Sequence, residues 1–108
     1  MAKHLSQFFH GGPMDGKPHI DDVGPRAAIA GGELQIRGQG FCPNGHSRPR
    51  VKFGGLEGSL LVCSDQFLVA RVPEGAVSSE LTVDNHQQSS NPIPVEVGVA
   101  IAENMHPV

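Results

Sequence analysis

Between residues 93 and 101, apolar side chains occupy every second position of the chain. A period of two residues is typical of a β-strand, because successive side chains of a strand point to opposite faces of the sheet. One side of this segment is therefore expected to face an apolar core. Pro94 cannot donate a backbone hydrogen bond, which predicts a sheet edge or a bulge there. The alternating apolar residues are Ile93, Val95, Val97, Val99 and Ile101.

Shorter runs of the same kind occur from Pro18 onward, separated by Gly, Pro, Asn and Ser residues that favour turns. They predict an all-β fold of about seven strands, arranged as an antiparallel sandwich, because no helix is long enough to connect parallel strands. The expected strands cover residues 19–23, 33–37, 50–53, 60–63, 67–72, 81–83 and 93–101. The side chains expected to form the core are Leu34, Ile36, Val51, Phe53, Leu68, Val72, Leu81, Val83, Val95 and Val97.

The composition restricts the classes of partner. The chain has 108 residues, of which 38% are hydrophobic and 18% are charged, and this describes one ordinary folded domain. Its net charge of −3 argues against a basic surface for DNA or RNA, so no nucleic acid partner is expected. Tryptophan and tyrosine are absent, which removes the ring types most favoured in sugar-binding platforms and interface hot spots.

The amino-terminal segment, residues 1–17, differs from the rest of the chain. Leu5, Phe8 and Phe9 would align on one face of a short helix that ends at Gly11. We expect either a flexible leader or a short helix whose apolar face docks on the domain or on a neighbour. No apolar run has signal-peptide length, and none approaches the roughly 20 apolar residues of a membrane helix, so no membrane insertion is expected. Residues 102–108 are expected to be a linker.

No residue pattern predicts an enzyme. The segment from Gly45 to Pro49 approaches the GxSxG nucleophile elbow, but Pro49 replaces the closing glycine and no helix is expected to follow. The histidines lack metal-ligand spacing and the acidic residues lack that of a calcium loop, so we expect no catalytic residues, no metal and no cofactor. Cys42 and Cys63 are either two small buried residues or one disulfide.

The strand over residues 67–72 predicts an interaction surface. Phe67 and Val69 lie on the face opposite to its core-facing side chains. They either fill a second layer or form an exposed apolar patch for a neighbouring domain. Together with Phe8 and Phe9 they are the candidate interaction residues.

A series of short motifs occurs in a characteristic order along the chain. They are Pro18–Pro25 with its Gly-Pro step, Gly31–Phe41 with a Gly-Gly start and a GxGF end, Val51–Gly55, and Val72–Pro73. The series resembles the IPT/TIG domain, an immunoglobulin-like fold of the E-set type found in plexins, in some transcription factors and in bacterial surface and secreted proteins. The resemblance implies such a domain over residues 18–101, and it carries no catalytic residues.

Two functions follow as hypotheses. The resemblance implies a non-catalytic interaction or spacer module, an accessory domain of a larger bacterial protein that packs on a neighbouring domain or protein partner. The alternative is a module that binds carbohydrate or another surface polymer, for which a groove with converging polar side chains and an exposed phenylalanine would be evidence. Residues 99–108 resemble the junction before a gluconolactonase-like or NHL-type β-propeller, which would then be the neighbour. The family resemblance implies a periplasmic or extracellular location.

Overall fold

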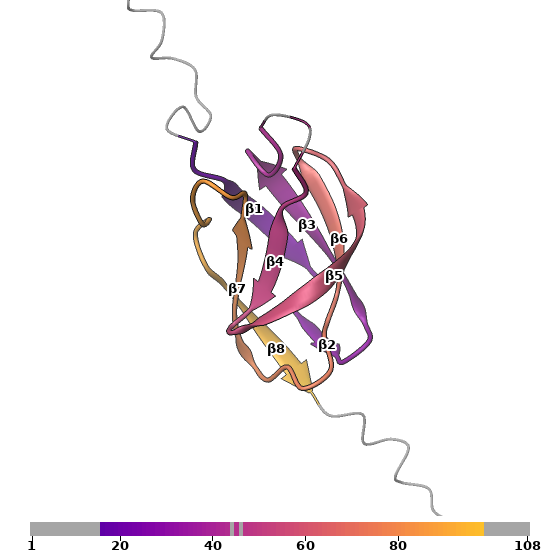
Figure 1. Ribbon diagram of the computed structural model, residues 1–108. Helices are drawn as coiled ribbons and strands as arrows, with labels where there is room; N and C mark the ends of the chain where they lie inside the picture. The colour runs from indigo at the N-terminus through magenta and orange to yellow at the C-terminus, as the bar shows by residue number, and fades with distance from the viewer. Residues whose placement is uncertain (1–15, 44, 46, 99–108) are drawn as a thin grey trace, which may run out of the picture.

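The computed structural model describes residues 16–43, 45 and 47–98, which form eight β-strands and contain no helix (Figure 1). The prediction of an all-β, immunoglobulin-like fold is confirmed. The strands are β1 (His19–Gly24), β2 (Ala27–Ile29), β3 (Glu33–Gln39), β4 (Arg50–Phe53), β5 (Leu56–Cys63), β6 (Phe67–Arg71), β7 (Ser79–Asp84) and β8 (Ile93–Gly98).

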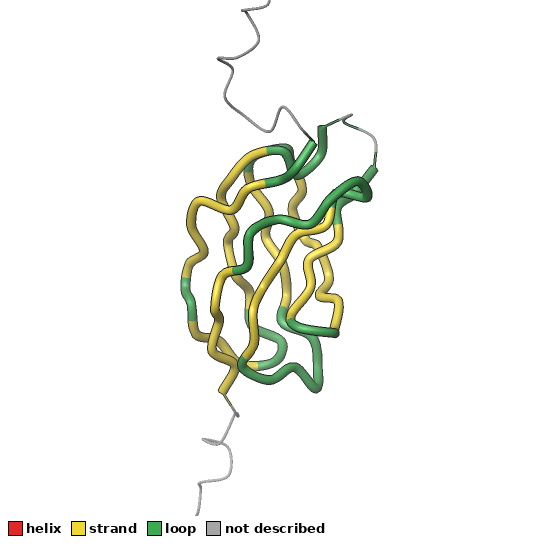
Figure 2. The backbone as a smooth tube through the Cα atoms, turned by 90° about the vertical axis from the view of Figure 1, so that its left-hand side faces the viewer, coloured by secondary structure: helices red, strands yellow, loops and turns green. Residues whose placement is uncertain are grey.

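The strands form one hydrogen-bonded sheet in the order β1-β3-β6-β5-β4-β7-β8-β2. The sheet folds over into two layers, with β1, β3 and β6 in one and β4, β7 and β8 in the other (Figures 1 and 2). Strand β5 belongs to both layers, because residues 56–58 pair with β4 and the rest of the strand pairs with β6. The outermost strands of the order, β1 and β2, are separated along the chain only by Pro25 and Arg26.

Strand β5 changes partner next to Gly58, where neighbouring atoms leave no room for a side chain. A Cβ at this position would lie 2.6 Å from the carbonyl oxygen of Arg71 and 2.7 Å from Cε1 of the buried Phe53 ring. Gly38 has the same role in β3, since a Cβ there would overlap the carbonyl oxygen of His19 in β1. Both glycines therefore allow close approach of backbones that a larger residue would separate.

The space between the layers is filled by the inward side chains of the strands. Of the core predicted from the sequence, every member is buried except Val97, which is only partly buried near the end of β8. The structure adds Ile20, Val23, Phe41 and Ala70 to this core. Phe41 was not expected there, because it follows β3 in a segment without alternation, yet its side chain is completely buried.

The strand pattern differs from the expectation at β2. Strand β2 was not predicted, because it has three residues and no clear alternation, and it pairs in parallel with β8. The sandwich is therefore eight-stranded and mixed, not seven-stranded and purely antiparallel. Strand β2 reaches only Glu96–Gly98 of β8, so Pro94 pairs with β7 on one side and, within the described residues, has no strand on the other. The sheet edge predicted at Pro94 is therefore confirmed. Val99 and Ile101, the last two alternating residues of the expected strand, lie outside the described residues.

The connection between β7 and β8 holds a buried polar side chain. Asn85 is only 4% exposed, and its Nδ2 donates hydrogen bonds of 2.9 Å to the carbonyl oxygens of Gly16 and Gly40. Its Oδ1 accepts hydrogen bonds from the backbone N–H groups of Gln87 and Gln88. All of these groups are thus satisfied away from water, which a buried amide requires. Asn85 connects three chain segments at one end of the sandwich.

A second set of side-chain hydrogen bonds joins the connection between β7 and β8 to β1. The Oδ1 of Asn91 accepts a 2.7 Å hydrogen bond from the backbone N–H of Ile20, and its Nδ2 donates one of 3.1 Å to the Ile20 carbonyl oxygen. The buried hydroxyl of Ser90 accepts a bond from the backbone N–H of Val83 and donates one to the Asn91 carbonyl. The amide side chain of Asn91 therefore replaces a strand partner for β1.

We predict that Gly58→Ala lowers the free energy of unfolding by about 1–3 kcal/mol, because the added methyl group overlaps backbone and a buried ring. Denaturant unfolding measures this loss. Gly55→Ala is the matched control: a Cβ at Gly55 meets nothing within 4 Å, and that variant should unfold like the parent chain. Equal stabilities of the two variants would contradict the packing argument.

We also predict that Asn85→Ala lowers the free energy of unfolding by about 2–4 kcal/mol, because it leaves buried backbone groups without partners. Ser89→Ala, at an exposed position of the same connection, should change it by less than about 0.5 kcal/mol. Thermal unfolding of both variants tests the claim, and a loss at Ser89 as large as that at Asn85 would refute it.

Candidate docking surface

The outer face of the layer that contains β3, β6 and β5 carries neighbouring apolar side chains. Strand β6 presents Phe67 and Val69 on this face, because the alternate residues of the strand point into the core. Val69 is paired with Val62 of β5, and Phe67 is paired with Arg37 of β3. Strands β5 and β6 therefore bring apolar groups together on one surface, and β3 places Arg37 beside them.

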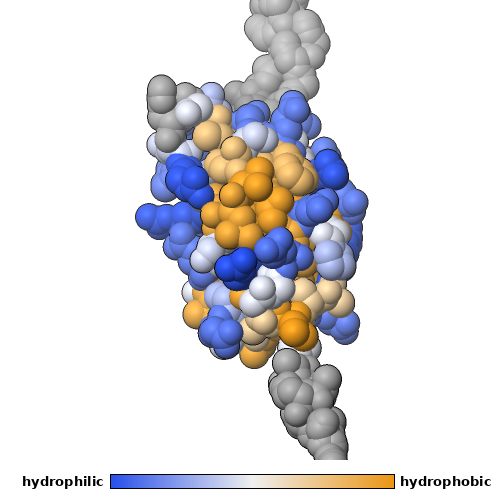
Figure 3. All heavy atoms as spheres, turned by 90° about the vertical axis from the view of Figure 1, so that its right-hand side faces the viewer, coloured by the Kyte–Doolittle hydropathy of each residue, from blue (hydrophilic) through white to orange (hydrophobic). Residues whose placement is uncertain are grey.

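A β-bulge in β5 enlarges this surface. The register between β5 and β6 shifts between Leu60 and Val62, so Leu61 is an extra residue in its strand. As a result the consecutive side chains of Leu61 and Val62 are both exposed, by 42% and 46%. In a regular strand one of the two would point inward. We call Leu61, Val62, Phe67 and Val69 the apolar patch, and Figure 3 shows apolar side chains gathered on this side of the molecule.

Arginine side chains border the apolar patch. The guanidinium carbon of Arg37 lies 4.9 Å from the centroid of the Phe67 ring, which is a cation–π distance. Arg71, on the same face of β6, forms a 3.3 Å ion pair with the Glu33 carboxylate of β3. This pair is half-exposed on both sides and contributes little to stability. Its main effect is to place charge beside the patch.

The interaction residues predicted from the sequence fall into two groups. The structure places Phe67 and Val69 together on β6, each partly exposed, and their role in binding stays a prediction. Phe8 and Phe9 lie outside the described residues. Sequence reasoning missed Leu61 and Val62, because the run Leu60–Cys63 is apolar throughout and does not indicate which side chains face outward. Only the bulge decides this, and it depends on pairing with β6.

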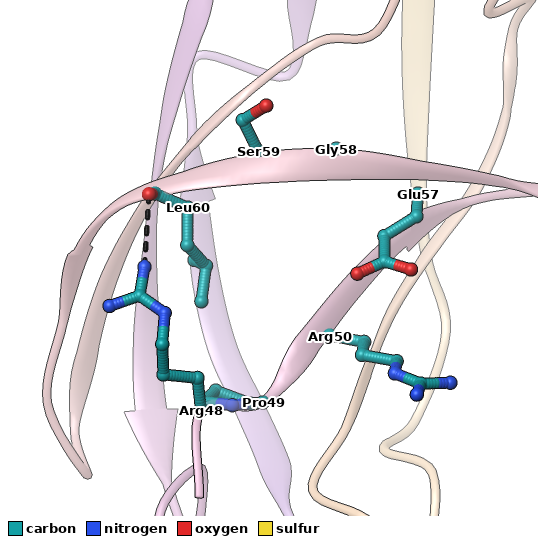
Figure 4. A pocket seen from close by; sticks show the side chains of 7 residues that line it. All are labelled: Arg48, Pro49, Arg50, Glu57, Gly58, Ser59 and Leu60. Atoms are coloured by element: carbon teal, nitrogen blue, oxygen red, sulfur yellow. Dashed lines mark hydrogen bonds between the residues drawn. The ribbon is translucent and has the colours of Figure 1, made fainter.

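A groove of about 510 Å³ lies between the start of β4 and the middle of β5 (Figure 4). The side chains of Arg48, Arg50, Glu57 and Ser59 line it, and none of the phenylalanines that the structure describes does. One guanidinium nitrogen of Arg48 donates a 3.1 Å hydrogen bond to the carbonyl oxygen of Leu60, the residue that precedes the bulge. Arg48 therefore lies between the groove and the apolar patch, and it adds a third arginine to the border of the patch.

Of the three basic residues around the start of β4, Arg48 and Arg50 line the groove and Lys52 does not. Lys52 approaches Asp84 of β7 to 4.0 Å, outside the groove. Within the part of the chain that the structure describes, Arg50 and Glu57 take part in no ion pair. The groove thus offers a cation and a carboxylate to a polar ligand, but no reactive pair resembling a nucleophile and its base.

Two further results concern residues 16–43, 45 and 47–98. In these ranges no three histidine, cysteine, aspartate or glutamate side chains lie close enough to share a metal ion. The same residues contain no helix with the length and apolar character needed to cross a membrane.

The same fold occurs in solved structures of larger bacterial proteins. The Gamma-CGTase of alkalophilic Bacillus clarkii is similar over 75% of this chain and 12% of its own, with 24% sequence identity and a TM-score of 0.63. SGBP-B from a complex xyloglucan utilization locus in Bacteroides uniformis is similar over 73% of this chain and 22% of its own, with 17% identity and a TM-score of 0.58. The chain therefore spans less than a quarter of these proteins.

An isolated domain is matched over nearly its whole length. The TIG domain of human nuclear factor of activated T-cells, cytoplasmic 4, is similar over 87% of this chain and 96% of its own, with 21% identity and a TM-score of 0.61. These structural likenesses concern the fold, and a comparison with curated proteins found no match. The family model described as the IPT/TIG domain matches residues 18–98, which include all eight strands. The chain belongs to the IPT/TIG domain family.

Proposed function

We propose that this chain is a non-catalytic interaction module that docks through its apolar patch onto a neighbouring protein domain. The observation that carries the proposal is the exposure of Leu61 and Val62 beside the partly exposed Phe67 and Val69. Contiguous exposed apolar side chains with a polar border are typical of interaction sites. The bulge that exposes two of them also supports the proposal, because bulges often redirect side chains at functional sites.

The charges around the patch indicate the chemistry of the partner. Arg37, Arg48 and Arg71 lie beside the patch, and of these three Arg71 is paired with a carboxylate, that of Glu33, so arginines supply positive charge here although the chain as a whole carries −3. A partner with an apolar centre and acidic side chains around it would complement this surface. A second copy of the chain fits less well, because pairing through the patch would bring two arginine-rich borders together.

The comparisons support the role of an accessory module within a larger protein. In the bacterial proteins of similar fold, the matching part is 12% to 22% of the chain. The partner proposed here is accordingly another domain of the same polypeptide. The resemblance of residues 99–108 to the junction before a β-propeller makes a propeller the first such domain to test.

Hydroxyl-radical footprinting tests the docking proposal. We predict that Leu61, Val62 and Phe67 will be labelled several-fold less in the protein expressed from the complete reading frame than in the isolated chain, because docking removes these side chains from water. Mass spectrometry of the peptides measures the labelling. Val77, 68% exposed in the connection between β6 and β7, is the internal control. Equal labelling of the patch in both proteins would refute docking onto a neighbouring domain.

A pair of variants separates docking from stability. Val62→Lys should change the free energy of unfolding of the isolated chain by less than about 0.5 kcal/mol, because the side chain is exposed. In the full-length protein it should restore the labelling of Phe67, while Val77→Lys should not. If Val62→Lys leaves Phe67 protected, the patch is not the contact surface.

Carbohydrate binding is the second candidate function, and the groove is the observation that favours it. Polar side chains converge there, and SGBP-B, one of the proteins of similar fold, comes from a xyloglucan utilization locus. Among the described residues no phenylalanine lines the groove, so these residues offer no aromatic ring on which a sugar could stack. This absence makes docking the better supported function.

Calorimetric titration with soluble xyloglucan distinguishes the two candidates. Under the docking proposal we predict no saturable heat of binding, because the groove offers hydrogen-bonding groups without an apolar platform. A saturable signal that disappears in Arg50→Ala, but persists in Lys52→Ala outside the groove, would favour carbohydrate binding instead.

A further inference from the structure

Two cysteines that are distant in sequence lie together at one end of the sandwich. The backbone N–H of Cys42 donates a 2.9 Å hydrogen bond to Oδ1 of Asp65, and the N–H of Phe41 donates one of 3.1 Å to the Asp65 carbonyl oxygen. Asp65 belongs to the turn between β5 and β6 and follows Cys63 by two residues. Backbone contacts therefore hold Cys42 beside the end of β5.

The position of Cys63 is equally well defined. It is paired with Leu68 across the β5–β6 ladder, and the next residue, Ser64, donates a 2.9 Å backbone hydrogen bond to the carbonyl oxygen of Phe67. Its side chain packs against the edge of the apolar core. Regular strand pairing thus fixes the second cysteine, and a flexible loop is not needed to bring the two together.

The two thiols lie near each other and are both free. The Cys42 thiol is near enough to Cys63 to raise the pKa of its thiol, and the Sγ of Cys42 donates a 3.2 Å hydrogen bond to the carbonyl oxygen of Ser47. Both residues are partly exposed, so a small reagent in solution can reach the sulfur atoms. Thiols that backbone hydrogen bonds hold near each other are in a suitable position to form a disulfide.

We infer that Cys42 and Cys63 form an intramolecular disulfide when the chain meets a small-molecule disulfide such as oxidised glutathione, and that this bond fastens the β3–β4 connection to the end of β5. The inference is independent of the docking function. It favours the disulfide among the alternatives that the sequence left open, since spacing alone did not show whether the cysteines lie near each other.

The reaction is a pair of thiol–disulfide exchanges. One cysteine, as its thiolate, attacks a sulfur of oxidised glutathione, which breaks that S–S bond and releases one glutathione thiolate. The other cysteine thiolate then attacks the protein sulfur of the mixed disulfide and releases the second glutathione. The two protein thiols lose two electrons and two protons, and the glutathione disulfide is reduced to two thiols.

The environment of Cys63 sets the pH dependence. Burial raises the pKa of its thiol, the nearby Cys42 thiol raises it further, and the Arg48 guanidinium partly offsets this. A raised pKa means a smaller thiolate fraction at neutral pH, so the exchange should accelerate as the pH increases beyond the range in which an ordinary thiol ionises.

The test uses the purified chain with and without oxidised glutathione. We predict a monomer that has lost two hydrogens by intact mass, a peptide in which Cys42 is linked to Cys63, and faster formation at higher pH. The thermal midpoint of the oxidised chain should be higher than that of the reduced chain by on the order of 10 °C, because the disulfide restricts the unfolded chain. Adding a thiol reductant should return the midpoint to that of the reduced chain. A glutathione adduct on the parent chain, a covalent dimer or two unmodified thiols would each overturn the inference.

Single-cysteine variants serve as controls. Cys42→Ser and Cys63→Ser should stop at one glutathione adduct and should lack the reductant-sensitive rise of the thermal midpoint. If either variant fails to fold, the oxidised and reduced forms of the parent chain still decide the question. A parent midpoint that oxidation leaves unchanged would show that the link does not fasten these two segments.

Discussion

Strand β5 holds the two layers together, because its first part pairs with β4 and its second part pairs with β6. The passage from one layer to the other requires the backbone at Gly58 to lie against the Phe53 ring and the Arg71 carbonyl. A continuous hydrogen-bonded strand thereby sets the register of both layers at once. The inward side chains of β4 and β6, including Val51 and Leu68, meet in one core as a consequence.

One end of this core is closed by a short segment that has no regular structure. Phe41 is completely buried there, and the residues on either side of it are held by side chains from other connections. Asn85 binds the carbonyl of Gly40, and Asp65 binds the N–H of Cys42. The buried Phe41 side chain and these hydrogen bonds depend on each other. Burying Phe41 brings neighbouring backbone groups inside, and without Asn85 and Asp65 those groups would have no partners. The proximity of the two cysteines is a further result of this closure.

The outer surface of the sandwich divides into regions with different chemistry. The bulge after Leu60 exposes apolar side chains on the β6 side of β5, whereas the part of β5 before it contributes to a polar groove with β4. Arg48 separates the two through its bond to the Leu60 carbonyl. A docking partner with an apolar centre and acidic periphery would contact the first region, and the groove would remain open to solvent.

Much of the fold could be predicted from the sequence, because strand alternation is a local property that neighbouring residues set among themselves. The runs around Leu34, Val51 and Leu81 alone indicated strands and their buried faces, and the ordered motifs indicated the family. Of the candidate site, Phe67 and Val69 could be located in the same way. Leu61 and Val62 could not, since a continuous apolar run is compatible with either face of a strand.

What the sequence by itself determined was therefore the all-β class, most of the strands and most of the core. Only the tertiary structure decided the parallel pairing of β2 with β8, the bulge in β5, the burial of Asn85 and the proximity of Cys42 to Cys63. Each of these depends on atoms that lie far apart along the chain. Their positions are set by how the layers pack, and no local pattern of residues contains that information.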